Sequence, residues 1–490
     1  MSSYKSIAKS SGLIAFVQIA QMLFALIRNK LISVLLGSAA FGLYSIYNTF
    51  IEMGTTFSIL GLNNSAVREI SRCNSDQIII GKVIYILNRL ILIFSLIIFT
   101  VTLLFSEKIA FYLFNEDGHQ KGVITIAFIM ILSVISKEGY AILNGIRSLR
   151  DLAISQIASS AIGSIGMILA IYFWGIDSIP ASMGIVYLSM SVITYAYVRK
   201  NNIHEVKATK IEFKNKSKSL LNIGIGVTIA GAISTIMTIM SKSFLTENYD
   251  MSTVGIYQAS WTISNLYTGI ILTAMGVDFM PRISGIIDKT QEAVKMINEQ
   301  IIFGIVMASI AITGILLFSK ELLYLLYSSE FTEASIIMRW QVLGVFLRVI
   351  AFPFSYTIIA KGWAKSYAII QIIFWVGDYL LLILFSKIWG FNGLGINYFI
   401  AYTCYLFLGY YLTKKICNFT ISKNLIKVFF TTIFFIITAW FITLIEIKID
   451  TLKYILYITL LTMHFIYIYI YTKKKMGINV IQYIKNKLNK

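Results

Sequence analysis

The chain has 490 residues, of which 57% are hydrophobic and 13% charged, and its formal net charge is +19. A soluble protein has about a quarter charged residues, and the mean hydropathy here is +0.77, which excludes a soluble globular fold. The composition indicates a polytopic membrane protein, because apolar runs long enough to cross a hydrocarbon core of about 30 Å recur along the chain. Basic cytoplasmic loops explain the positive charge better than a nucleic-acid partner does.

The spans are predicted to be helices. In lipid only helices and closed barrels satisfy the backbone internally, and barrel strands alternate polar and apolar residues. The run LILIFSLIIFTVTLLF, residues 90–105, is instead apolar on every side. We expect an all-α protein with about fourteen transmembrane helices, at residues 11–36, 41–66, 83–105, 122–146, 152–174, 179–198, 219–243, 253–279, 299–318, 336–360, 366–386, 392–413, 428–445 and 454–471.

The Lys and Arg residues fall mainly on one side of these spans. With the N-terminus in the cytoplasm, 29 lie on the cytoplasmic side, 7 on the far side and 6 within spans. This bias follows the positive-inside rule and predicts that both termini are cytoplasmic. No far-side loop exceeds about 20 residues, so any function is expected to lie within the helix bundle.

A repeat links the two halves of the sequence. Gly42-Leu43-Tyr44 returns 213 residues later as Gly255-Ile256-Tyr257, and Trp174-Gly175 returns 215 residues later as Trp389-Gly390. The repeat unit contains six spans, an even number, so both copies enter the membrane from the same side. We therefore expect two parallel six-helix lobes plus two C-terminal helices. The glycine is expected to allow a tight entry into the membrane, and the tyrosine to lie at the interface.

The predicted domains follow from this repeat. They are an N-terminal lobe at 1–200, a basic cytoplasmic linker at 201–218, a C-terminal lobe at 219–414, two further helices at 424–472 and a basic cytoplasmic tail at 473–490.

Ionisable residues within the spans are the candidate functional residues, because each costs about 2.5–3.5 kcal/mol near the bilayer centre on insertion scales. Such residues face a polar cavity or pair with one another. Bases outnumber acids, which suits a cavity for an anionic head group, since Arg binds phosphate through paired donors. Candidate substrate-binding residues are Arg28, Lys30, Arg89, Lys137 and Arg348, and candidate coupling or ion-pair residues are Glu52, Glu138 and Asp378.

The alternative for these residues is a set of static buried ion pairs that hold helices together. Arg348 and Asp378, at matched depth in successive helices, are the expected pair. For Lys30 and Arg339, within two turns of the external surface, the alternative is snorkelling to the interface.

The sequence contains no hydrolase elbow, nucleotide motif or paired catalytic carboxylates. Its three Cys and three His are scattered, which argues against a disulfide framework and a metal site. We therefore predict a protein that is not an enzyme, with no catalytic residues, no cofactor and no metal.

The stretches RNKLISVLLGSAAFGLYSIYNTF (28–50), VGIYQASWTI (254–263) and MPRIS (280–284), with the basic cytoplasmic loops, carry a family resemblance. They resemble the polysaccharide-transport (Wzx-type, O-antigen flippase) branch of the multidrug/oligosaccharidyl-lipid/polysaccharide (MOP) exporter superfamily, over nearly the whole chain. The resemblance implies translocation of an undecaprenyl-diphosphate-linked oligosaccharide, an O-antigen or similar surface polysaccharide unit. The movement would run from the cytoplasmic to the outer leaflet of the bacterial inner membrane, through a central cationic cavity with alternating access.

The implied partners are the lipid-linked oligosaccharide, membrane lipids and other polysaccharide-assembly membrane proteins. Coupling to a proton or sodium gradient, or to the membrane potential, is compatible with the charge balance. The alternatives are a multidrug antiporter or a lipid II flippase of the same superfamily, and a scaffold that recruits glycan-assembly enzymes without transport. Twelve spans and a carboxylate-rich cavity would favour the antiporter, and reconstitution in liposomes separates a transporter from a scaffold.

Overall fold

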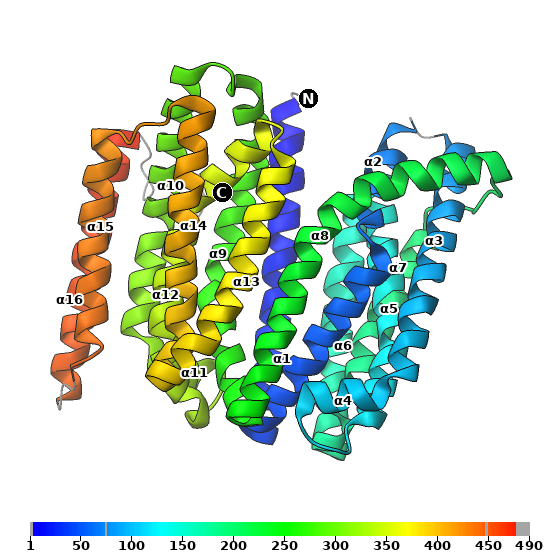
Figure 1. Cartoon of the computed structure of the whole chain (residues 1–490), viewed down its shortest axis with the longest axis horizontal. Coiled ribbons are helices and arrows are strands. Elements are labelled where there is room, and N and C mark those ends of the chain that lie inside the picture. Colours follow the sequence, from blue (N-terminus) through cyan, green and yellow to red (C-terminus); the bar gives the residue numbers. More distant parts are fainter. Residues whose placement is uncertain (1–2, 74–75, 446–448, 477–490) are drawn as a thin grey trace, which may run out of the picture. The chain divides into compact units, whose positions relative to one another are not determined.

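The computed structural model describes residues 3–73, 76–445 and 449–476, and the regular structure of these residues is helical (Figure 1). In the described part of the chain, ten helices are long and apolar enough to cross a membrane. The number is eleven if the bent pair Met251–Thr273 and Asp278–Ile286 forms one span. The predicted class, an all-α polytopic membrane protein, is confirmed.

The helices of the first half are α1 (Ser3–Ile59), α2 (Leu62–Arg72), α3 (Gln77–Leu104), α4 (Ser106–Phe114), α5 (Gln120–Gly145), α6 (Leu149–Trp174), α7 (Ile179–Lys200) and α8 (Lys210–Asn248). Those of the second half are α9 (Met251–Ile286), α10 (Thr290–Leu317), α11 (Ser319–Leu326), α12 (Ala334–Ala360), α13 (Ala364–Trp389), α14 (Gly393–Cys417), α15 (Lys423–Ile442) and α16 (Asp450–Tyr471). Each predicted span overlaps one of these helices.

The predicted spans 11–36 and 41–66 both belong to α1. Gly37 interrupts this helix with φ 80°, a backbone conformation that only glycine adopts readily. The second span ends at Ile59, earlier than predicted, because Leu60 and Gly61 both have positive φ and α2 begins after them. The apolar part, Phe16–Ile59, has 44 residues. Its length is about 66 Å, enough for two crossings.

The order and lengths of several helices recur in the two halves of the chain. Helices α3 and α10 both have 28 residues, and each is followed by a short helix, α4 or α11. Helices α6 and α13 both have 26 residues and end at the Trp of the Trp-Gly pair. Gly175 and Gly390 both have positive φ, 68° and 54°, and a 3₁₀ turn follows in both copies. The repeated sequence therefore encodes a repeated succession of helices.

The two Gly-x-Tyr motifs meet each other. A Cβ atom on Gly42 would lie 2.1 Å from the carbonyl oxygen of Met251, and a Cβ on Gly255 would lie 2.1 Å from that of Ser38. Beside this contact, the hydroxyls of Ser38 and Ser252 are 2.6 Å apart. The glycines therefore permit the close crossing of α1 and α9.

Tyr44 and Tyr257, the tyrosines of the motifs, are each only 8% exposed. They are therefore covered by protein, and their predicted position at the membrane interface stays a prediction. They sit two residues beyond the glycine crossing, where the closeness of the two helices leaves their rings surrounded by protein.

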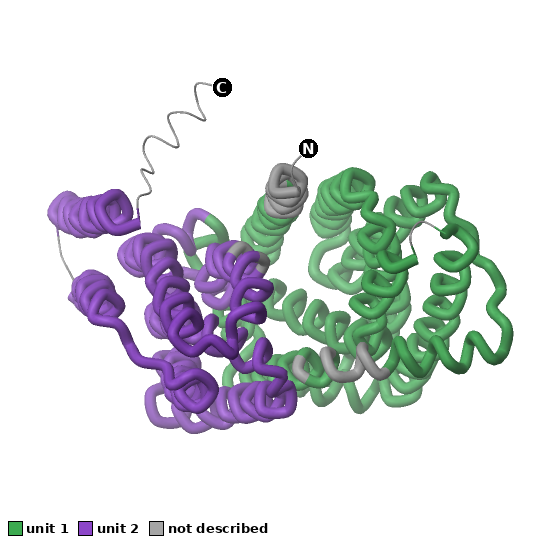
Figure 2. Tube along the Cα trace, turned by 90° about the horizontal axis from the view of Figure 1, so that it is seen from above, with its two compact units in different colours: residues 1–258, 326–330 green, residues 259–325, 331–490 purple. Residues whose placement is uncertain are grey.

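The chain divides into two compact units, residues 1–258 with 326–330 and residues 259–325 with 331–490 (Figure 2). In the first unit α5 packs on α1, α3 and α7, and α8 packs on α1 through α4. In the second unit α12 packs on α10 and α14, α13 packs on α14, and α15 and α16 pack on α10. The limits of these units are defined by contacts between helices, whereas the predicted limits of the lobes were drawn from the sequence repeat. The predicted domain limits stay a prediction.

Candidate functional site

Charged and polar side chains of the first unit gather along the part of α1 after its kink. Asn48 donates a 3.1 Å hydrogen bond to Glu52 Oε1, and the Tyr187 hydroxyl of α7 donates to Asn48 Oδ1 over 3.4 Å. Glu52 lies within electrostatic range of Lys137 on α5 and of Lys242 on α8. Two predicted residues, Glu52 and Lys137, are therefore brought together.

Arg28 lies at the edge of this group. Its guanidinium is 5.7 Å from the centroid of the Tyr44 ring, a cation–π distance, and it lies within electrostatic range of Tyr187. Its Nε is buried and has no hydrogen-bond partner among the described residues. Arg28 thus keeps a donor for an acceptor-rich anion. We call Arg28, Glu52, Lys137, Tyr187 and Lys242 the α1 cluster.

Lys242 was not predicted as a functional residue, because the predicted span 219–243 put it at the outer end. Helix α8 in fact continues to Asn248, and Lys242 is only 3% exposed. Its Nζ donates to the carbonyl oxygen of Ser45 (2.9 Å) and to Thr49 Oγ1 (2.6 Å). The sequence signal was the stretch SKSFLTEN (241–248), which contains no Gly or Pro that would end the helix earlier.

The other predicted residues of the first unit have different surroundings. Lys30 donates to the backbone carbonyl of Tyr327. Arg89 is exposed, and its guanidinium lies 5.4 Å from the centre of the Tyr85 ring. Glu138 is half-buried, and its Oε1 has no hydrogen-bond partner among the described residues.

In the second unit, Arg348 of α12 lies in a group of tyrosines. Its Nη1 donates a 2.9 Å hydrogen bond to Asn265 Oδ1, and Tyr398, Tyr402 and Tyr405 of α14 lie within electrostatic range of the guanidinium. The spacing of these tyrosines places them on one face of α14, and the rings of the first two are 4.8 Å apart. The arrangement combines one cation with several aromatic hydroxyls.

Asp378 of α13 is buried and accepts a 2.7 Å hydrogen bond from Asn397 Nδ2 of α14. Arg348 bonds to Asn265 instead, and no salt bridge in the described part of the chain joins Arg348 to Asp378. The expected ion pair was wrong. Matched depth does not make two residues face each other, because the rotation of each helix about its axis decides that.

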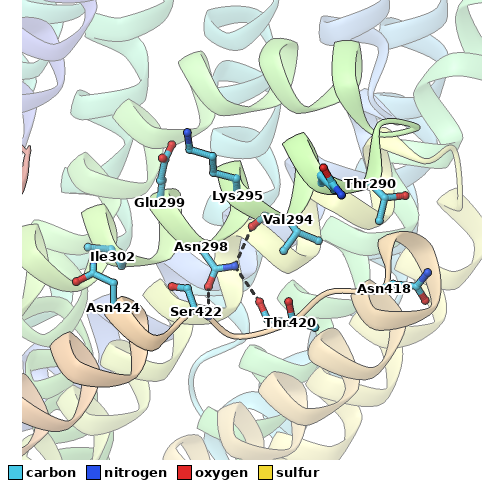
Figure 3. Close-up of a pocket in the computed structure, with 11 residues that line it drawn as sticks. Thr290, Val294, Lys295, Asn298, Glu299, Ile302, Asn418, Thr420, Ser422 and Asn424 are labelled. Atoms are coloured by element: carbon cyan, nitrogen blue, oxygen red, sulfur yellow. Dashed lines mark hydrogen bonds between the residues drawn. The ribbon is translucent and has the colours of Figure 1, made fainter.

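A cavity of about 500 Å³ lies beside the first half of α10, lined mainly by amide and hydroxyl side chains (Figure 3). Asn298 donates to the carbonyl oxygens of Val294 (2.8 Å) and Thr420 (3.0 Å) and accepts from the Ser422 backbone N–H (2.8 Å). The Ser422 side chain in turn caps α15 by accepting from the Leu425 N–H. Because Asn298 uses both donors and its acceptor, it holds the α14–α15 connection in place.

Within the described residues, no three His, Cys, Asp or Glu side chains are grouped so that they could hold a metal ion. The buried His464 shares a 2.9 Å hydrogen bond with Thr313 and stacks on Phe435, with ring centroids 4.6 Å apart. This histidine thus joins α16 to α10 and α15.

Comparison with known proteins identifies the family. The profile of a family described as polysaccharide biosynthesis protein matches residues 7–287. The chain belongs to this family. It is 24% identical over 387 residues to the lipid III flippase of Escherichia coli (strain K12), over 78% of this chain and 91% of the relative. It is 26% identical over 393 residues to a putative O-antigen transporter of Shigella flexneri, with 78% and 92% covered.

Solved structures share the fold of this family member. The lipid II flippase MurJ in an inward closed conformation matches with a TM-score of 0.74 at 16% identity, over 96% of this chain and 100% of that chain. An inward-facing multidrug resistance transporter of the MATE family, from the MOP superfamily, matches with a TM-score of 0.65 at 16% identity, over 82% and 97%. Together with the family match, this confirms the predicted superfamily. The chain is a multi-pass membrane transporter and not an enzyme.

Proposed function

We propose that this protein is a flippase for an undecaprenyl-diphosphate-linked oligosaccharide, an O-antigen or similar surface polysaccharide unit. It would move this substrate from the cytoplasmic to the outer leaflet of the bacterial inner membrane. The α1 cluster carries the proposal, because it gathers three basic side chains against one acid in a family whose relatives bear the names of flippases and transporters.

The substrate's diphosphate is the proposed ligand of the cluster. The bases Arg28, Lys137 and Lys242 exceed the single acid Glu52 by two charges, and a diphosphate carries about two negative charges. Arg28 supplies a buried donor without a partner among the described residues. Lys30 and Arg89 are further proposed contacts for the substrate's phosphates.

Arg348 and its tyrosines are the proposed contact for the sugar. Aromatic rings stack on sugar rings, while their hydroxyls form hydrogen bonds with sugar hydroxyls. Arg348 would add a charge that favours acidic sugars. This assignment separates the part of the substrate shared by all lipid-linked glycans from the part that differs between them.

The proposed transport cycle uses fourteen spans in two parallel lobes that alternate between inward-open and outward-open states. Two observations support this count. Residues 16–59 are long enough for two crossings, and the candidate span Ala364–Cys417 consists of two packed helices, α13 and α14. Both termini would lie in the cytoplasm.

Glu52, Glu138 and Asp378 are the proposed coupling residues for protons or sodium. The membrane potential is the alternative driving force, because a potential negative inside favours outward movement of an anion by about 2.3 kcal/mol per charge per 100 mV.

Reconstitution in liposomes tests the function. Undecaprenyl-diphosphate-linked oligosaccharide would be placed in one leaflet, and its appearance in the other measured with an impermeant lectin. We expect wild-type transport and at least a tenfold lower rate for Arg28→Gln and Lys242→Met. Arg282→Gln is the control, because Arg282 is exposed and pairs only with Asp278 one turn away among the described residues.

The alternatives predict different results. A lipid II flippase would transport lipid II but not the lipid-linked oligosaccharide of a surface polymer. A scaffold would transport neither lipid. Wild-type rates in both cluster variants would refute the role of the α1 cluster even if the protein transports the glycan.

A further inference from the structure

We propose that a second cavity, about 450 Å³ in volume, binds the phosphoethanolamine head group of a membrane lipid, with the phosphate on Arg339 and the ammonium near carboxylates of the rim. The site is separate from the residues assigned to transport. It belongs to the second unit. The first turns of α11, α12 and α16 line it, together with the end of α10 and residues 443–445.

Two polar groups in the wall of this cavity lack partners. Arg339 forms no hydrogen bond with any described residue, and its Nε is buried. Ser335, one turn earlier on α12, is fully buried, and its hydroxyl is also without a partner in the described part of the chain. A buried polar group without a hydrogen bond costs about 1–3 kcal/mol, and more when it is charged. A ligand rich in acceptors would satisfy both.

Glu321, an acid in the wall of this cavity, already has two hydrogen-bond partners. Glu321 accepts from Lys453 (2.8 Å) and from the Tyr454 hydroxyl (3.1 Å). Lys453 also lies over the Tyr457 ring, 5.4 Å from its centroid. Among the described residues, Arg339 therefore has no counter-ion on this side of the cavity. Phosphate, like a carboxylate, matches the fork of a guanidinium through two parallel hydrogen bonds, and it is the anion that membrane lipids supply.

The rim of the cavity has the opposite charge. Glu333 and Asp450 are exposed and form no salt bridge with the described residues, and Lys320 is the basic residue beside them. The described part of the rim thus carries a net negative charge around an inner cation. A head group with phosphate at its inner end and ammonium at its outer end complements this order, whereas a purely anionic head group would meet repulsion at the rim.

The surroundings of the cavity are those of a lipid site. Arg339 is five residues after the start of α12, so it lies about 7.5 Å along the axis from that end. Exposed apolar side chains lie next to the cavity in sequence, namely Phe441, Ile445, Leu452 and Ile455. An acyl chain is the natural neighbour of such residues, and a phosphate lies at the depth where spanning helices end.

The test measures binding of three probes to the purified full chain in detergent. These are dihexanoyl phosphatidylethanolamine, dihexanoyl phosphatidylglycerol and inorganic phosphate, with Kd obtained from thermal stabilisation at increasing concentration. We expect the ethanolamine lipid to bind most tightly. Arg339→Gln should raise its Kd about 10- to 100-fold, which corresponds to the loss of a charged hydrogen bond. The Kd of Arg339→Lys for this lipid should lie between those of the wild type and Arg339→Gln, because lysine keeps the positive charge but lacks the paired donors of the guanidinium.

Rim and control variants complete the test. Glu333→Gln should weaken binding of the ethanolamine lipid and strengthen binding of the glycerol lipid, because the rim then repels an anionic head group less. Arg282→Gln should change neither Kd. Equal affinity of wild type and Arg339→Gln would overturn the proposal, as would equal binding of the two lipids or equal stabilisation by phosphate alone. If Arg339→Gln does not fold, Ser335→Val and Glu333→Gln carry the same comparison.

Discussion

Replacement of Gly42 by alanine tests the close contact between α1 and α9. The added Cβ would lie 2.1 Å from the Met251 carbonyl oxygen, whereas real Cβ contacts essentially never fall below 3.0 Å. The two backbones must therefore separate by at least 0.9 Å. This shift would lengthen the 2.6 Å contact between the Ser38 and Ser252 hydroxyls to about 3.5 Å, beyond hydrogen-bonding distance.

The expected cost follows from these two effects. Overpacking of a tight contact costs about 1–3 kcal/mol, and the lost hydrogen bond adds about 1 kcal/mol. We expect Gly42→Ala to destabilise the protein by about 2–4 kcal/mol, less the gain of up to about 1 kcal/mol that alanine brings to a helix. Gly255→Ala should cost a similar amount, since its Cβ would lie 2.1 Å from the Ser38 carbonyl oxygen.

The measurement is thermal unfolding of the detergent-solubilised protein. Gly231→Ala is the matched control, because Gly231 lies within α8 and a Cβ there would have nothing within 4 Å. One separation of α1 from α9 relieves both clashes, so the double variant Gly42→Ala with Gly255→Ala should cost less than the sum of the two. An unfolding temperature of Gly42→Ala equal to that of Gly231→Ala would refute the close crossing, and additive costs would refute the shared separation.

Three further predictions concern other parts of the molecule. Lys82 and the Thr209 cap lower the pKa of Glu212, on the predicted cytoplasmic side, from 4.5 to about 2. The stabilisation of the fold by these contacts to the Glu212 carboxylate is therefore complete above about pH 4.5 and is lost as pH falls through about 2. Glu212→Gln should reduce the fall in unfolding temperature between pH 5 and 3. An unchanged pH profile of the unfolding temperature would contradict this prediction. Lys242→Met should unfold at the same or a higher temperature, because it removes a buried charge whose hydrogen-bond partners, the Ser45 carbonyl and the Thr49 hydroxyl, are neutral. Marked destabilisation would show that the lysine clamps α8 to α1. Asn298→Ala should cost about 1–3 kcal/mol and expose residues 418–422 to limited proteolysis, because it leaves a backbone N–H and carbonyls unsatisfied, whereas Gln291→Ala in the same cavity should cost nothing measurable.

Helices and their repetition were predictable because they depend on local sequence. Apolar runs mark spans wherever they occur, and Trp174-Gly175 and Trp389-Gly390 mark matching helix ends because glycine accepts the positive φ that ends both helices. Glu52 and Lys137 stood out for a similar reason, since a charge within an apolar run is conspicuous without knowledge of its neighbours.

Pairings between helices were not predictable, because they depend on helix rotation and on packing over long sequence distances. Arg348 and Asp378 were expected to pair from their depth, yet each binds an asparagine on another helix. The depth of Lys242 depended on where α8 ends, which the span limits missed by five residues. The glycine motifs were visible in the sequence, but nothing in it indicated that the two copies touch.

The glycine crossing has the symmetry of an interface between two identical subunits. In a symmetric homodimer, when residue i of one subunit meets residue j of the other, j of the first meets i of the second. Ser38 facing Gly255 and Met251 facing Gly42 obey this rule within one chain, at a constant offset of 213 positions. The two copies are not equivalent elsewhere, because Glu52 corresponds by the same offset to Asn265, which accepts a hydrogen bond from Arg348. A single chain can thus place an acidic residue at one copy of a position and a neutral residue at the other, which two identical subunits cannot do.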